Sequence, residues 1–129
     1  MKKLLFSAML FLGITLLSNA QIVVSGNITS NTTWTNNNIY ILSGFVYVKA
    51  GATLTIEPGT IIKGDFATKG SLIIERDAKI YANGTVTQPI VFTSQKAVGQ
   101  RSYGDWGGLI VCGRASVNQP ANPGGSPAT

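Results

Sequence analysis

A nine-residue pattern recurs three times in the middle of this chain, at 46–54, 54–62 and 72–80. The copies are VYVKAGATL, LTIEPGTII and LIIERDAKI, with apolar residues at the first, third and ninth places. The sixth place holds Gly51, Gly59 or Asp77, which accept a positive φ more readily than most residues and therefore suit a tight bend. Each copy predicts a strand, a turn and a second strand, and the repetition of this unit favours a coiled solenoid.

A longer period supports the same architecture. Apolar-x-apolar pairs begin at Leu54, Leu72, Ile90 and Leu109, so they recur every eighteen or nineteen positions. One such period supplies roughly 60 Å of extended chain, enough for one polygonal turn. We therefore predict an all-β fold, a parallel β-helix with about eighteen to nineteen residues per coil, in which residues eighteen apart lie directly above one another. A β-sandwich of antiparallel hairpins is the alternative, because it also has turn signals roughly every 8 to 12 residues.

The first twenty residues predict a secretory signal peptide. A basic start at Lys2 and Lys3 precedes the apolar run 4–17, and small residues precede the expected cleavage after Ala20. No later segment approaches the roughly 20 apolar residues that a membrane helix needs. We expect a mature chain without a membrane span, either secreted or held at the outer cell surface.

The remaining segments differ in composition. Residues 21–45, rich in Ser, Thr and Asn, predict an N-terminal cap region in which Trp34 closes the first coil, and 46–117 predict the coils. Residues 118–129 are rich in Pro, Gly and Ala and predict a loop or linker. Because solenoids cover their open ends with a capping element, we expect this chain to be the N-terminal fragment of a longer protein.

Composition excludes several function classes. The net charge of +5 falls to +3 once Lys2 and Lys3 are removed, and the remaining basic residues are scattered, so no nucleic-acid partner is expected. The chain has no His, which excludes serine-histidine triads and histidine zinc sites. Cys112 is the only cysteine, and its apolar neighbours predict a small buried hydrophobe.

Two acidic residues share one place in the nine-residue pattern. Glu57 and Glu75 both take the fourth place of their copies, and the predicted stacking would set their carboxylates side by side. A hard cation such as Ca²⁺ would offset their repulsion, as would basic neighbours of a solvated pair. They are therefore weak candidates for a metal site, and no residue of the segment is assigned a catalytic role.

The most distinctive segment outside the repeats is 103–108, Tyr-Gly-Asp-Trp-Gly-Gly. Trp106 either packs over the edge of a coil or lies exposed as a platform for a sugar ring, and the Asp105 side chain can cap the adjacent turn. Tyr103, Asp105 and Trp106 are accordingly the candidate ligand-binding residues.

Three segments carry a family resemblance: IEPGTIIKG, ANGTVTQPIVFTS and GDWGGLIVCGRASVN. They resemble secreted right-handed parallel β-helix proteins of pectin-lyase-like architecture, which Gram-negative bacteria export to the cell surface by a type IX route. The resemblance spans about 46–120. It implies the right-handed coil, a β-helix that continues beyond Thr129 and the secretion machinery as a partner. It transfers no catalytic residue to a position in this chain.

Two functions remain open. The first is a secreted or cell-surface scaffold, an adhesin or carbohydrate-binding rod, whose partner is an extracellular glycan or surface matrix. The second is the N-terminal part of a polysaccharide lyase or glycoside hydrolase, which rests on analogy of fold alone. We expect no catalysis within this segment, and no cofactor beyond the weak Ca²⁺ candidate.

Overall fold

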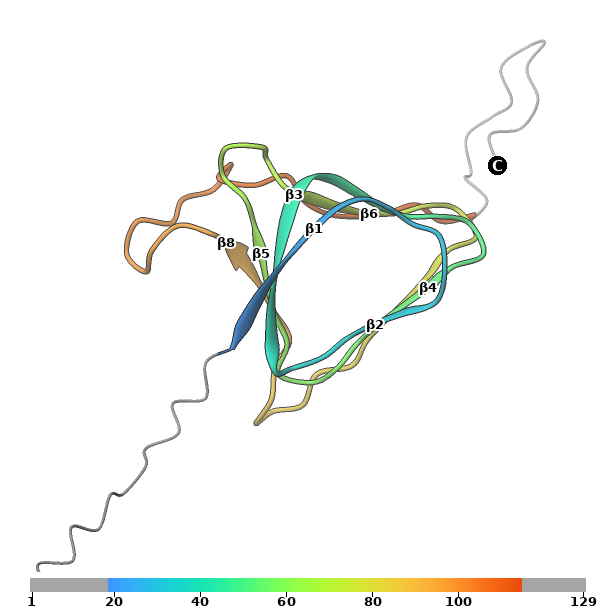
Figure 1. Cartoon of the computed structure of the whole chain (residues 1–129), viewed down its shortest axis with the longest axis horizontal. Helices are drawn as coiled ribbons and strands as arrows, with labels where there is room; N and C mark the ends of the chain where they lie inside the picture. Colours follow the sequence, from blue (N-terminus) through green and yellow to red (C-terminus); the bar gives the residue numbers. More distant parts are fainter. Residues whose placement is uncertain (1–18, 115–129) are drawn as a thin grey trace, which may run out of the picture.

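The computed structural model describes residues 19–114, which form nine β-strands wound into a right-handed parallel β-helix (Figure 1). The strands are β1 (Ala20–Ile28), β2 (Thr32–Trp34), β3 (Asn38–Val48), β4 (Thr53–Ile56), β5 (Ile61–Gly64), β6 (Ser71–Ile74), β7 (Lys79–Ala82), β8 (Val91–Ser94) and β9 (Gly108–Val111). Every strand pair is parallel. The predicted all-β parallel β-helix is confirmed, and the β-sandwich alternative is wrong because it requires antiparallel pairs.

Seen end-on, the coils superpose as a triangle with three faces (Figure 1). Face 1 contains the first halves of β1 and β3 with β5 and β8, and face 2 contains their second halves with β6 and β9. Face 3 is the separate sheet β2-β4-β7. Faces 1 and 2 form one sheet, because β1 and β3 run around the bend between them, with positive φ at Gly26 (72°) and Gly44 (64°).

Three corners connect these faces. The short corner leads from face 2 to face 3, the middle corner from face 3 to face 1, and the long corner from face 1 to face 2. The nine-residue copies at 46–54 and 72–80 both cross the short corner and stack on each other, since Val46 pairs with Leu72 and Leu54 with Ile80. The copy at 54–62 crosses the middle corner.

The residues assigned to tight bends have the backbone conformation that such bends require. The φ angle is 84° at Gly51, 84° at Gly59 and 68° at Asp77. Asp77 is one of two residues other than glycine with positive φ in the described part of the chain. The short and middle corners are therefore recognisable in the sequence by Gly or Asp at the position that takes a positive φ in the structure.

The predicted coil length holds only at the start of the helix, where the first part of β1 stacks on β3 with a separation of 18 residues, as for Ile22 and Tyr40. The separation in sequence between stacked residues then rises through 22, for Ile39 and Ile61, to 37, for Leu72 and Leu109, so the prediction is wrong for the later coils. Leu54 lies between Thr32 and Ile80, so Leu54, Leu72 and Ile90 do not stack on one another. The interval found in the sequence joins strands on different faces, because a coil has three strands and its loops lengthen from coil to coil.

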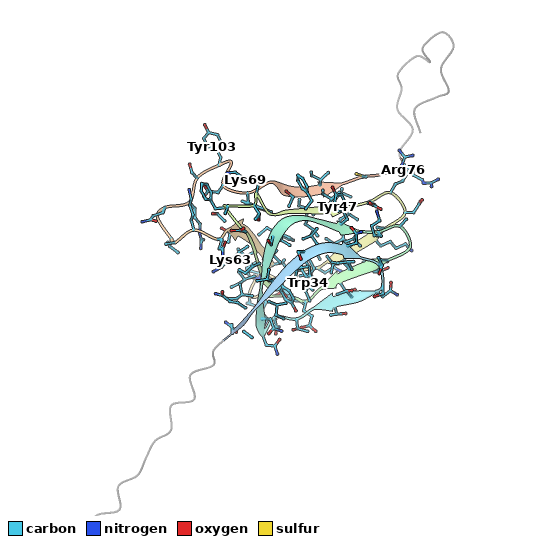
Figure 2. All side chains as sticks on the ribbon, turned by 45° about the horizontal axis from the view of Figure 1, so that its top comes forward. Trp34, Tyr47, Lys63, Lys69, Arg76 and Tyr103 are labelled. Carbon is cyan, nitrogen blue, oxygen red and sulfur yellow. The ribbon has the colours of Figure 1, made fainter. Side chains whose placement is uncertain are left out.

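The first coil begins earlier than predicted. Strand β1 stacks on β3 from Ala20 onward, so residues 21–45 belong to the coils and do not form a separate cap region. Trp34 is 2% exposed, and its ring stacks on that of Tyr40 with centroids 4.8 Å apart. This pair fills the interior near the start of the helix, where Figure 2 shows Trp34 among the coils.

The core consists of inward-facing residues in vertical ladders. Val46 and Leu72 form one ladder and Val48 and Ile74 another, each residue no more than 1% exposed. Leu54 and Ile56 close the third side from face 3. Burying such aliphatic side chains stabilises the fold by about 1.5–3 kcal/mol each. Alternation of inward and outward residues along short strands thus accounts for the pattern in the sequence.

Within residues 19–114 no helix is long and apolar enough to cross a membrane. Residues 1–18 of the predicted signal peptide and the whole predicted linker, 118–129, lie outside the described residues.

Candidate functional site

The long corner differs from the other two because its connections grow along the helix. The first two crossings are bends within β1 and β3. The third is the loop 65–70, and the fourth is the much longer loop 95–107. Both loops project from the same side of the triangle (Figure 1). They carry polar and aromatic side chains that the core does not need.

The 65–70 loop is held by the carboxylate of Asp65. It accepts hydrogen bonds from the backbone N–H groups of Ala67 (3.3 Å) and Thr68 (3.2 Å) and from the Thr68 hydroxyl (2.6 Å). These bonds, that of the Thr68 hydroxyl first, hold the pKa of Asp65 below its ordinary value of 3.8. Thr68 Oγ1 also accepts from the Gly44 N–H at 2.8 Å, which ties the loop to the bend of the preceding coil.

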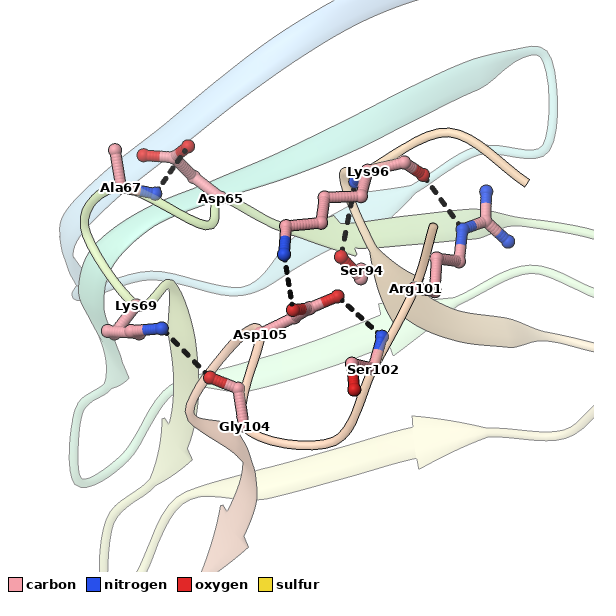
Figure 3. A network of polar contacts seen from close by, with 9 residues as sticks. All are labelled: Asp65, Ala67, Lys69, Ser94, Lys96, Arg101, Ser102, Gly104 and Asp105. Carbon is pink, nitrogen blue, oxygen red and sulfur yellow. Dashed lines mark hydrogen bonds and ion pairs between the residues drawn. The ribbon is translucent and has the colours of Figure 1, made fainter. Parts of the chain in front are cut away.

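The 95–107 loop closes on a second carboxylate, that of Asp105, whose side chain is 2% exposed. It accepts from the Ser102 N–H at 2.8 Å and from Lys96 Nζ at 2.9 Å (Figure 3). The Ser102 N–H, followed by Lys96, lowers the pKa of Asp105 to about 2, against the opposing effect of burial. Asp105 is therefore ionised at neutral pH and connects the start of its loop, at Lys96, to the part near its end, at Ser102.

Phe66 joins the two loops. The Lys69 and Lys96 ammonium groups lie 4.2 Å and 3.8 Å from the centroid of its ring, within the range of cation–π attraction. Lys69 Nζ also donates to the Gly104 carbonyl at 2.9 Å (Figure 3). Because Lys96 is also paired with Asp105, the loops are connected through an aromatic ring and two charged side chains.

Trp106 anchors the longer loop to the core. Gly64, which pairs with Leu42 and so shares its inward orientation, lies against Trp106. A Cβ added at Gly64 would lie 2.4 Å from Trp106 Cβ. The indole is half-buried and packs against the core cluster. Trp106 therefore packs over the edge of a coil and does not form an exposed platform for a sugar ring.

The structure keeps Tyr103, Asp105 and Trp106 together in one loop but gives them different roles. Asp105 is buried and Trp106 is half-buried, whereas Tyr103 is fully exposed. Figure 2 shows Tyr103 projecting outward near Lys69. Only Tyr103 of the three presents its ring to a ligand in this conformation.

Sequence reasoning missed Phe66, Lys69 and Lys96. They follow no periodicity, since they lie in loops that interrupt the spacing of the apolar pairs. That interruption is the one signal that could have pointed to them. Their proximity depends on the register between β5 and β8, which the sequence did not disclose.

The predicted stacking of Glu57 and Glu75 is wrong. Glu57 lies at the middle corner and accepts from the Asn36 N–H at 3.2 Å, whereas Glu75 lies at the short corner in an ion pair with Lys49. Residues 19–114 contain no group of three or more His, Cys, Asp or Glu side chains that could hold a metal ion. The two-carboxylate site therefore has no geometric basis in this part of the chain.

Cys112 is exposed, contrary to the prediction of a buried hydrophobe. It follows β9, and its N–H donates to the Ile74 carbonyl at 2.9 Å, which places it in the corner position that Glu75 occupies one coil earlier. Alternation explains the difference, because Val111 takes the inward position of its ladder and Cys112 is the next residue.

Residues 26–129 match the family model described as pectate-lyase like β-helix domain. The chain belongs to this family. No curated protein and no solved structure matches the chain. In this pectate-lyase-like β-helix, the matched region includes the strands from β2 to β9 and both loops of the long corner.

All five acidic residues of this pectate-lyase-like β-helix lie in the described part of the chain, and each is held by a donor. Two accept hydrogen bonds from uncharged donors, Glu57 from Asn36 and Asp65 from Thr68. The other three form ion pairs: Glu75 with Lys49, Asp77 with Arg114 and Asp105 with Lys96. Glycoside hydrolysis ordinarily uses two carboxyl groups facing the scissile bond. The carboxylates at 19–114 instead maintain turns and loops, and the long corner offers an ordered surface with an exposed aromatic ring.

Proposed function

We propose that this chain is an exported β-helix scaffold, secreted or held at the cell surface, whose long corner binds an extracellular glycan without transforming it. The observation that carries the proposal is that the 65–70 and 95–107 loops are connected to each other while aromatic side chains on them stay exposed. Phe66, Lys69, Lys96 and Asp105 connect the 65–70 and 95–107 loops, while Tyr103 remains fully exposed.

Such a surface suits carbohydrate. An aromatic ring offers a flat apolar surface against which the C–H groups of a sugar ring can pack. Tyr103 is fully exposed and Phe66 is 44% exposed, with the Lys69 ammonium between the loops as a hydrogen-bond donor. Because hydrogen bonds and an ion pair already hold the backbone of both loops, ordering these loops adds little to the entropic cost of binding.

The protonation states favour binding over acid–base chemistry. A general acid is most effective when its pKa lies near the working pH. Asp105 has its pKa lowered to about 2, and the pKa of Asp65 is shifted in the same direction. Neither carboxyl would hold a proton to donate at neutral pH, which supports the structural role of both.

The alternative is that the chain is the N-terminal part of a polysaccharide lyase or hydrolase. The family description supports it, because that description names a pectate lyase. In that case the described coils support a catalytic region elsewhere in the protein, and binding at the long corner would orient the polysaccharide.

Export is the cellular part of the proposal. It rests on the basic and apolar pattern of residues 1–20 and implies the secretion machinery as a partner. Mass spectrometry of the protein recovered from the culture medium or cell surface is expected to find Gln21 as its first residue. Retention of Met1 in a protein confined to the cell would contradict export.

Glycan binding is tested by applying the purified protein to an array of neutral and acidic glycans, with Tyr103→Ala beside a matched variant, Tyr81→Ala. Tyr81 is 51% exposed on face 3, away from the long corner. We expect Tyr103→Ala to weaken binding by about tenfold and Tyr81→Ala to leave it unchanged. Equal effects of the two variants would contradict the site.

Catalysis is tested in parallel by incubating the same polysaccharides with the protein and measuring unsaturated products and new reducing ends. We expect neither to accumulate above the level of a protein-free control. Turnover that Tyr103→Ala reduces would overturn the non-catalytic proposal and favour the lyase or hydrolase alternative.

A further inference from the structure

Charge is distributed very unevenly along this chain. After Lys3 the next charged residue is Lys49, and the five acidic and eight remaining basic residues all lie between Lys49 and Arg114. The first coil, comprising β1, β2 and the turns around them, therefore carries no charged side chain. At the overall charged fraction of 12%, residues 4–48 would hold about five.

The same coil is an open end of the stack formed by the described residues. Strand β1 pairs with β3 and β2 pairs with β4, and among residues 19–114 no strand lies on their other edges. The inward-facing Ile22 is 39% exposed and the outward-facing Val23 is 67% exposed. Strand β1 thus presents unpaired backbone groups beside exposed apolar side chains.

Natural proteins protect such edges, most often with charged side chains or Pro. β1 has the sequence AQIVVSGNI and contains neither. The opposite end of the described stack has Lys79 in β7, and an Arg114–Asp77 ion pair follows β9. The outer strands β8 and β9 also contain neither a charged residue nor Pro, but the first coil is the end of the described stack with no charged side chain in its strands or turns, so its edge is suited to pairing with another strand.

We propose that the first coil is a self-association surface, through which a second copy of this chain adds its own first coil end to end. The neutral edge favours an identical partner, because no like-charged side chains meet at any register of the pairing. A two-fold axis makes such a contact self-complementary and closed. The inference rests on the fold and the charge distribution, and it is independent of glycan binding.

The triangular cross-section gives this contact a specific geometry. An axis through the middle of face 1 and the opposite short corner sets the β1 segments before the bulge, which in the exported chain are residues 21–24, antiparallel to each other. Inward-facing Ile22 and Val24 then continue the interior across the junction. The same rotation exchanges faces 2 and 3, so Gly26–Ile28 of one copy lies over β2 of the other.

The test is sedimentation velocity of the purified full chain over a wide concentration range, with its first residue identified by mass spectrometry. We expect a monomer–dimer equilibrium. Val23→Lys sets a charge on the outward side of the edge without entering the core, and is expected to raise the dimer dissociation constant by about tenfold or more. Val86→Lys is the matched control, because Val86 is fully exposed in the middle-corner loop of a later coil. It is expected to leave the equilibrium unchanged.

Hydrogen exchange locates the contact. Amides of β1 and β2 are expected to gain protection as the dimer forms, and to lose it in Val23→Lys. A chain that stays monomeric at every concentration would overturn the proposal. So would a dimer that Val23→Lys does not weaken, or β1 amides protected equally in the monomer, which would indicate that residues 1–18 or another segment already cover the edge.

Discussion

The short corner and the long corner connect the same coils, yet they are built differently. The short corner has the same length in two successive coils, 49–52 and 75–78, with a residue of positive φ at the same place in both. The long corner expands from the bend at Gly44 to the loop 65–70 and then to the loop 95–107. One corner repeats, while the other varies.

The hydrogen bonds reflect this difference. At the short corner, stacked backbones bond directly, as in the 3.1 Å bond from the Gly51 N–H to the Asp77 carbonyl. At the long corner, side chains such as Asp65 and Asp105 supply much of the bonding. A corner of constant length sets the stacking register, and this leaves the other corner free to accept insertions that carry a binding surface.

The largest expected effect tests whether the long corner is anchored through the core. Gly64→Val would force a side chain into the volume held by Trp106, whose Cβ lies 2.4 Å from the position of the added Cβ. We expect a loss of about 3 kcal/mol in the free energy of unfolding, measured by urea denaturation. Binding through Tyr103 is expected to fall as well, because the 95–107 loop would be displaced.

A double mutant provides the control. In a Trp106→Ala background, Gly64→Val is expected to cost less than about 1 kcal/mol, because the clash is gone. Costs that simply add would show that Gly64 and Trp106 act independently and that the anchor lies elsewhere.

The contrast between the corners also explains what the sequence could predict. The motif around Gly51 and Asp77 was visible because a bend of fixed length repeats with its turn chemistry intact. The stacking of Leu72 on Leu109 could not be predicted, since it depends on the length of the 95–107 loop. A turn preference is encoded within a few neighbouring residues, whereas the register between stacked strands depends on the lengths of all the loops in a coil.

The same limit applies to the candidate site. Tyr103, Asp105 and Trp106 were recognised because glycines flank an aromatic and an acidic residue. Which of them packs and which is exposed depends on Gly64, which lies in an earlier coil and far away in the sequence. Phe66 and Lys96 come together only through the pairing of β5 with β8, so no local pattern could link them.

An intermediate effect concerns the charge at Asp105. The ordinary carboxyl pKa of 3.8 is lowered to about 2 in the fold, so the ionised form stabilises the protein above about pH 4 and this contribution is lost as the pH falls toward 2. We expect Asp105→Asn to lower the urea midpoint at pH 6 and the difference from the unmodified protein to shrink between pH 4 and pH 2.

Asp65→Asn serves as the comparison within the same corner. Its carboxylate bonds only within the 65–70 loop, so the variant is expected to leave the environment of Trp106, followed by indole fluorescence, unchanged. A deficit in Asp105→Asn that stays constant from pH 6 to pH 2 would show that shape, and not charge, gives Asp105 its role.

The smallest expected effect tests the short corner. A Cβ at Gly51 would meet no atom within 4 Å, so the cost of Gly51→Ala comes only from its φ of 84° and should be about 1 kcal/mol by urea denaturation. Gly51→Asp copies Asp77, which holds a φ of 68° at the stacked position, and is expected to cost less than Gly51→Ala. Since the two corners are separate, neither variant should change glycan binding. If Gly51→Asp proved the more costly, Asp77 would owe its place to the exposed ion pair with Arg114 and not to its tolerance of positive φ.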